Sequence, residues 1–128
     1  MAVLMELDVI DAGTIQTLRL RLCDERVAAT EAIESSKRVM ADLLGARRDT
    51  ADDEHDPEGP TVGVQFAESS ALLQNSRHHL DQVNAALARM TNGTYGSCEL
   101  CGTDIPLARL DARPFAAHCV RCAQVVGA

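Results

Sequence analysis

The chain has 128 residues and a net charge of −7, and the whole acidic excess lies in residues 1–93. Such a charge disfavours general affinity for nucleic acid, which depends on neutralising phosphates. The sequence contains neither a run of about 18 apolar residues, as a membrane span needs, nor a basic and apolar signal peptide at its start. We therefore expect a cytoplasmic protein with no membrane partner.

The apolar residues are mostly small. They make up 46% of the chain, but it has no Trp, one Tyr and two Phe. Ala, Val and Leu fill a narrow seam between long helices better than a thick globular core. The composition therefore predicts a fold dominated by α-helices.

The first predicted helix runs from Thr14 to about Arg48 and follows an N-terminal segment, residues 1–13. Thr14 is its expected N-cap. Apolar residues recur with a period of seven at two seam positions, which Glu25 and Ser36 interrupt, and Ile33 lies beside the seam. The apolar seam residues are Ile15, Leu18, Leu22, Ala29, Ala32, Val39, Leu43 and Ala46.

The second predicted helix ends at Asn92-Gly93, a strong helix stop. Its seam residues are Phe66, Ser69, Leu73, Ser76, Leu80, Val83, Leu87 and Met90. A solitary amphipathic helix would leave its apolar stripe in water, so the two helices are expected to pair. Residues 14–92 therefore predict a long antiparallel two-helix coiled-coil hairpin, which we expect to be monomeric.

Residues 49–63, with the sequence DTADDEHDPEGPTVG, connect the two helices. Six of the first ten residues are acidic, and none is Lys or Arg. Pro57, Gly59, Pro60 and Gly63 are expected to prevent continued helix. The segment has two interpretations: a solvated turn, or an acidic tip that places carboxylates in a partner's cleft, facing a cation or basic side chains.

Four of the five cysteines have the spacing C-x2-C-x17-C-x2-C, formed by Cys98, Cys101, Cys119 and Cys122. Each Cys-x-x-Cys turn aims two sulfurs at one point, and two such turns complete a tetrahedron around Zn²⁺. In a reducing compartment such thiols are more often metal ligands than disulfides. The spacing predicts one structural Zn²⁺ ion with no open coordination position, so we do not expect an enzyme.

Two redox-active Cys-x-x-Cys pairs are the competing interpretation, but they require a strand-helix-strand setting that this sequence lacks. Cys23 has no partner pair and is expected to be an ordinary thiol. His118 is expected to be a surface residue or a supporting neighbour of the metal. Pro106 is expected to open a short helix, and a terminal helix of about two turns is expected to begin near Cys119.

Three arginines, Arg109, Arg113 and Arg121, form the basic face of the cysteine-containing module, residues 93–128. They have two interpretations. One is solubility and helix capping, and the other is a docking surface for an acidic partner.

Residues 93–122 read GTYGSCELCGTDIPLARLDARPFAAHCVRC. Together with the hairpin and its acidic tip, this segment resembles the DksA/TraR family of bacterial transcription regulators. It matches the family's zinc-finger motif almost position for position from Gly93 to Cys122. The resemblance implies a protein that binds RNA polymerase directly rather than DNA. It also implies that the hairpin enters the secondary channel and brings tip aspartates near the catalytic centre.

The family's tip pattern is Asp-x-x-Asp-x-Ala. Asp53 and Asp56 stand at its two aspartate positions, and Glu58 stands at the alanine position. The resemblance therefore implies that Asp53 and Asp56 are the effector carboxylates. Binding of ppGpp, which in the family uses basic residues on a longer terminal helix, is not expected, because only Arg121 lies there.

The alternative function is that of a zinc-ribbon adaptor. It would bind another protein, or DNA through Arg109, Arg113 and Arg121, and the hairpin would serve as a dimerisation coil. The leading prediction is a non-enzymatic regulator that docks on RNA polymerase without sequence-specific DNA binding.

Overall fold

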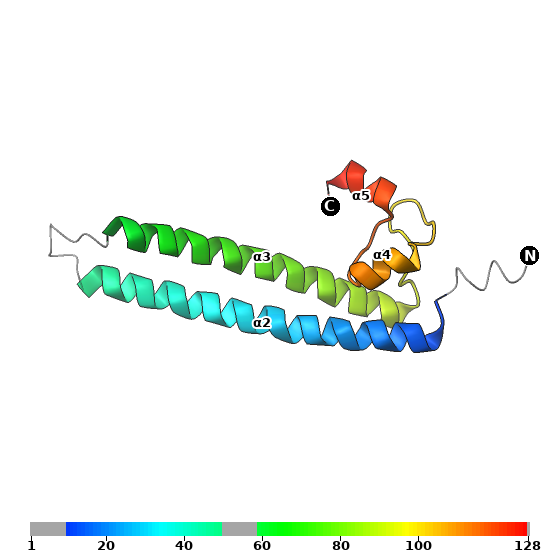
Figure 1. Cartoon of the computed structure of the whole chain (residues 1–128), viewed down its shortest axis with the longest axis horizontal. Helices are drawn as coiled ribbons and strands as arrows, with labels where there is room; N and C mark the ends of the chain where they lie inside the picture. The colour runs from blue at the N-terminus through cyan, green and yellow to red at the C-terminus, as the bar shows by residue number, and fades with distance from the viewer. Residues whose placement is uncertain (1–9, 50–58, 128) are drawn as a thin grey trace, which may run out of the picture. The chain divides into compact units, whose positions relative to one another are not determined.

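The computed structural model describes residues 10–49 and 59–127. Within these ranges it contains four α-helices and no strand, which confirms the predicted fold class. Two helices are long, α2 (Ala12–Asp49) and α3 (Gly59–Asn92), and two are short, α4 (Leu107–Ala112) and α5 (Val120–Val126) (Figure 1). None of these helices combines the length and the apolar character needed to cross a membrane.

Helix α2 begins earlier than predicted because an aspartate caps it. The Oδ1 atom of Asp11 accepts a hydrogen bond from the backbone N–H of Thr14 at 2.6 Å. This bond holds the pKa of the Asp11 carboxyl below its usual value. Thr14 is therefore not the N-cap that the sequence predicts. A carboxylate also interacts favourably with the partial positive charge at a helix start.

Helix α3 also begins earlier than predicted, at Gly59, within the expected turn 49–63. Pro60 is the second residue of the helix, where its missing N–H would have had no partner within the helix in any case. Gly63 lies inside the helix, with open space where a Cβ would stand. The other end agrees with prediction: α3 stops before Gly93, whose φ of +78° favours glycine.

The described residues form two compact units, and the first combines the part of the chain up to Arg26 with the part from Asp81 onward. Its core joins α2, α3 and the cysteine-containing module. Leu22 of α2, Val83 of α3 and Leu110 of α4 are fully buried in it. The core residues are Leu18, Leu22, Val83, Ala86, Met90, Cys98, Ile105, Leu110, Ala116 and Cys122.

The second unit, Val27–Leu80, contains the remaining parts of the two long helices, which run antiparallel to each other (Figure 1). Its buried residues are Ala29, Ile33, Ser36, Ser69 and Leu73. Ile33 is buried although the sequence places it beside the seam, whereas the predicted seam residue Val39 is 41% exposed. A straight helix drifts against a seven-residue repeat, so burial does not follow strict sevens.

Candidate metal centre

The turn between α3 and the first cysteine pair depends on Gly96. Its φ is +92°, a conformation that side chains disfavour. A Cβ at this position would also lie 2.8 Å from the Cδ1 atom of Ile10. The backbone conformation therefore favours glycine, and any side chain at this position would also force Ile10 to shift. The backbone N–H of Ile105 donates to the Gly96 carbonyl at 2.7 Å and closes the loop that contains the first pair.

The first cysteine pair lies in a tight hydrogen-bonded turn. The backbone N–H of Cys98 donates to the Thr103 carbonyl at 2.8 Å, and the N–H of Gly102 donates back to the Cys98 carbonyl at 2.9 Å. The hydroxyl of Thr103 lies 2.8 Å from the Sγ atom of Cys101. These contacts hold the backbone of the turn in one conformation and so set the positions of both sulfurs.

The second pair lies at the start of α5. Cys119 is the N-cap of the helix, and its Sγ atom accepts a hydrogen bond from the Cys122 N–H at 3.5 Å. The first helical turn carries Cys122 back towards Cys119. The two halves of the module are tied together by the Glu99 N–H, which donates to the Ala117 carbonyl at 2.9 Å.

The four sulfur atoms lie within 4.8 Å of one another, although seventeen residues separate the pairs in sequence. The Sγ atoms of Cys101 and Cys119 are 3.8 Å apart. A tetrahedral zinc site with Zn–S bonds of about 2.3 Å has S···S edges of about 3.8 Å. The cluster therefore has the donor set and the size that a structural zinc ion requires. It is the only group of three or more His, Cys, Asp or Glu ligand atoms found at this spacing in residues 10–49 and 59–127.

The thiols differ in their affinity for protons before metal is bound. A hydrogen bond from the Cys101 backbone lowers the pKa of Cys98 to about 6, and the hydroxyl of Thr103 lowers the pKa of Cys101. The hydrogen bond with Cys119, and then burial, raise the pKa of Cys122 to about 12. A zinc ion favours the thiolate form of every ligand, so it would overcome the raised pKa of Cys122.

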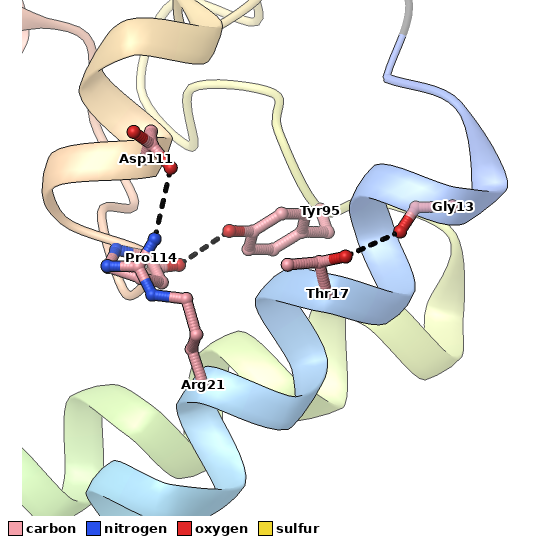
Figure 2. Close-up of polar contacts among 6 residues, drawn as sticks. All are labelled: Gly13, Thr17, Arg21, Tyr95, Asp111 and Pro114. Atoms are coloured by element: carbon pink, nitrogen blue, oxygen red, sulfur yellow. Dashed lines mark hydrogen bonds and ion pairs between the residues drawn. The ribbon is translucent and has the colours of Figure 1, made fainter.

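Side chains from α4 and from the turn after α3 hold the loop before the second pair. The Nε atom of Arg109 donates to the backbone carbonyl of His118 at 2.9 Å. The hydroxyl of Tyr95 donates to the Pro114 carbonyl at 2.7 Å, and burial raises the pKa of this tyrosine to about 12 (Figure 2). The residues just before Cys119 are therefore fixed by donors from other parts of the module.

Arg89, near the end of α3, is a supporting residue that the sequence did not reveal. It is only 8% exposed, and its NH1 atom lies 3.4 Å from the Glu99 carboxylate. Its NH2 atom donates to the backbone carbonyls of Phe115 and Ala116, at 3.5 and 3.4 Å. A basic residue in the last helical turn usually interacts with the helix end, so the sequence offered no signal for this role.

We expect Arg89→Met to destabilise the first unit by about 1–3 kcal/mol, because it leaves two carbonyls and Glu99 without their donor. Methionine keeps an unbranched side chain of similar reach, so lost packing contributes little. Urea unfolding of the zinc-loaded protein measures the effect. The matched control is Arg77→Met, at an exposed position of α3 in the second unit, with an expected change within about 0.5 kcal/mol. Equal losses for the two variants would contradict the role assigned to Arg89.

The three arginines predicted to form a docking surface have different environments in the structure. Arg109 is half-buried and its Nε atom is used inside the module. The guanidinium carbon of Arg113 lies 5.6 Å from the centre of the Phe115 ring, and Arg121 is exposed on α5. Their docking role stays a prediction. The two predicted tip residues, Asp53 and Asp56, lie outside the described residues.

Part of the chain is similar in sequence to known proteins. The family described as "Prokaryotic dksA/traR C4-type zinc finger" matches residues 93–126. The RNA polymerase-binding transcription factor DksA of Haemophilus influenzae is 32% identical over 69 residues, which cover 52% of this chain and 48% of that protein. General stress protein 16O of Bacillus subtilis is 38% identical over 64 residues, or 50% of this chain and 39% of the relative. In each of these two relatives the match spans less than half of the protein.

A solved structure matches more of the chain. The transcription factor DksA2 from Pseudomonas aeruginosa superposes with a TM-score of 0.69, at 26% sequence identity. The match covers 90% of this chain and 84% of that one. The similarity therefore includes the long helices as well as the cysteine-containing module.

Proposed function

Because this chain belongs to the DksA/TraR family, we propose that it is a bacterial transcription regulator that binds RNA polymerase directly. The observation that carries the proposal is the four-sulfur cluster, held in a module that matches the family's zinc finger and is continuous with two long paired helices. The DksA relatives named as RNA polymerase-binding factors support the choice of partner.

The protein carries one structural zinc ion, and we assign Cys98, Cys101, Cys119 and Cys122 as its ligands. Four thiolates around zinc leave no position for water or substrate. The metal centre therefore supplies folding stability rather than catalysis, and we propose that the protein is not an enzyme. We also propose that it acts as a monomer in the cytoplasm. Residues 93–128 hold the metal, and residues 14–92 present the acidic segment.

The proposed mechanism places the acidic segment in the secondary channel of the polymerase. Asp53 and Asp56 are the effector carboxylates, which would act on a cation or on basic side chains near the catalytic centre. Glu58 adds a third acid where the family pattern has alanine. The effect on transcription initiation depends on the carboxylates and not on zinc chemistry.

Transcription from a ribosomal-type promoter tests this mechanism. We expect the wild-type protein to change the yield of initiated transcript, and the double variant Asp53→Asn/Asp56→Asn to lose most of this effect. The wild-type protein and the double variant should both co-purify with core RNA polymerase, since the substitutions leave the described helices and the zinc module intact. A photo-crosslinker at position 56 should attach to the polymerase.

The control is Asp24→Asn/Asp81→Asn, which removes the same charge from exposed positions on α2 and α3. It is expected to behave as wild type. Failure of the wild-type protein to bind core polymerase would refute the proposed partner. Normal activity of the double variant at positions 53 and 56 would refute the tip mechanism alone.

A further inference from the structure

The two compact units differ in how well their apolar side chains are buried. In the first unit, Leu22 and Leu110 are fully buried, and all residues of the core around them lie in this unit. In the described part of the second unit five residues are buried, and each keeps 6–8% of its surface exposed. Only two of them, Ile33 and Leu73, have large apolar side chains. The second unit therefore gains less free energy from the burial of apolar surface.

Two buried serines lie at about the same level of the paired helices in the second unit. Leu43 of α2 and Phe66 of α3 line one pocket, of about 40 Å³, so the helices meet at these positions. Leu73 lies seven residues after Phe66, and Ser36 lies seven residues before Leu43. Because the helices are antiparallel, Ser36 and Leu73 are level with each other (Figure 1). Ser69 is one helical turn from Leu73 and, like Ser36, is only 8% exposed. We call Ser36 and Ser69 the serine layer.

The serine layer contributes little to the attraction between the two helices. A serine side chain offers much less apolar surface than the leucine or isoleucine that such a position usually holds. Burial also takes its hydroxyl out of water, which costs free energy unless the hydroxyl finds a hydrogen-bond partner. A bond to a carbonyl one turn earlier in the same helix would satisfy the hydroxyl but would not join the helices. The layer therefore lowers the free energy needed to separate α2 from α3 in this unit.

The first unit is stabilised further by contacts between distant parts of the chain and by the metal centre. Arg21 of α2 pairs with Asp111 of α4 at 3.1 Å (Figure 2). Arg89 of α3 donates to two carbonyls of the loop before the second cysteine pair. Zinc binds the folded module, so its binding free energy adds to the stability of the first unit. The described residues of the second unit include no group of metal-ligand atoms at such spacing.

We propose that the second unit opens as a separate step and that the serine layer determines how easily it opens. In this step the paired parts of α2 and α3 in the second unit separate, while the first unit keeps its fold and its zinc. Segments that open at low free energy are those that change conformation in function. The second unit can therefore adjust to a partner without disturbing the metal centre. The proposal concerns the free protein and does not depend on the identity of its partner.

Amide hydrogen exchange in the zinc-loaded full-length protein, followed by NMR, tests the separate opening. After correction for intrinsic rates, we expect amides of residues 29–40 and 66–77 to exchange at least about tenfold faster than those of residues 17–25 and 82–90. Leu22→Ala should speed exchange in the first unit at least about tenfold, because it leaves a cavity there. It should leave exchange in the second unit unchanged, since that unit opens while the first stays folded. Equal exchange in the two units, or equal acceleration by Leu22→Ala, would overturn the proposal.

The double variant Ser36→Ala/Ser69→Ala tests the role of the serine layer. Its matched control is Ser35→Ala/Ser70→Ala, at the adjacent positions, where Ser35 is exposed and Ser70 is half-buried. Both variants raise helix propensity by the same amount, but only the first removes the two buried hydroxyls. We expect the first to slow exchange in the second unit at least about fivefold more than the control does. Equal slowing by the two variants would refute the role of the serine layer.

Discussion

Cys98→Ser is expected to remove the structural zinc ion from the purified protein. A serine hydroxyl does not replace a thiolate as a zinc ligand, and Cys98 is buried in the core of the first unit. We expect zinc affinity to fall by more than about 100-fold, since the loss of an outer partner of a ligand already costs about 10- to 100-fold. Metal analysis after dialysis against a chelator should find one zinc ion per wild-type chain and almost none in the variant.

The loss of zinc is expected to unfold the module as well. Zinc binding contributes about 10–16 kcal/mol to the folding of small zinc-finger peptides. The core of the first unit includes Cys98 and Cys122 together with Leu110, so it loses its arrangement when the sulfurs separate. Tyr95 is the only tyrosine and the chain has no tryptophan. The fluorescence of Tyr95 therefore reports on the hydrogen bond between its hydroxyl and the Pro114 carbonyl.

Cys23→Ser is the matched control. It makes the same chemical change at a half-buried thiol that lies outside the sulfur cluster. Zinc content and tyrosine fluorescence should equal those of the wild type. Full zinc retention in Cys98→Ser after dialysis would contradict the ligand assignment.

Leu22→Ala is expected to destabilise the first unit by about 2–5 kcal/mol, the usual range for a buried leucine that leaves a cavity. Leu22 is fully buried in the cluster that also contains Val83 and Ala86 of α3. The substitution removes apolar contact between the two long helices beneath the metal module. Because the cluster includes two of the zinc ligands, zinc should also leave the variant at a lower chelator concentration.

The control is Leu20→Ala, two residues earlier on the same helix, where the side chain is 58% exposed. Its effect should stay within about 0.5 kcal/mol, because it creates no cavity. Urea unfolding of both zinc-loaded proteins gives the comparison. If the two variants were equally stable, the packing assigned to Leu22 would be wrong.

Local sequence patterns predicted much of the fold. The seven-residue spacing of small apolar side chains predicted two paired long helices, and Asn92-Gly93 predicted where the second helix ends. Pro106 predicted the start of α4, and the start of α5 near Cys119 was also correct. Each of these features depends on residues close together in the chain, so its physical cause can be read without the tertiary structure.

The helix starts that the structure places differently from the predictions involve competition between local sequence signals. Asp11 and Thr14 are both good N-cap residues, and the structure selects Asp11. The Gly59-Pro60 pair predicts a turn or the first turn of a helix equally well, and the structure selects the helix. Propensity alone cannot rank two choices of similar free energy, because packing against the rest of the chain decides between them.

By itself the sequence determined which four cysteines can bind zinc, that two Cys-x-x-Cys turns can surround the ion as a tetrahedron, and the apolar periodicity of the two long helices. Each of these features is set by residues a few positions apart. Only the tertiary structure decided that Arg89 and Arg109 hold the carbonyls of the loop before Cys119. The tertiary structure also decided that the Ile10 side chain packs against Gly96 and that a groove lies between α2 and α4. These contacts join residues far apart in the chain, and such pairs have no spacing rule that a single sequence could show.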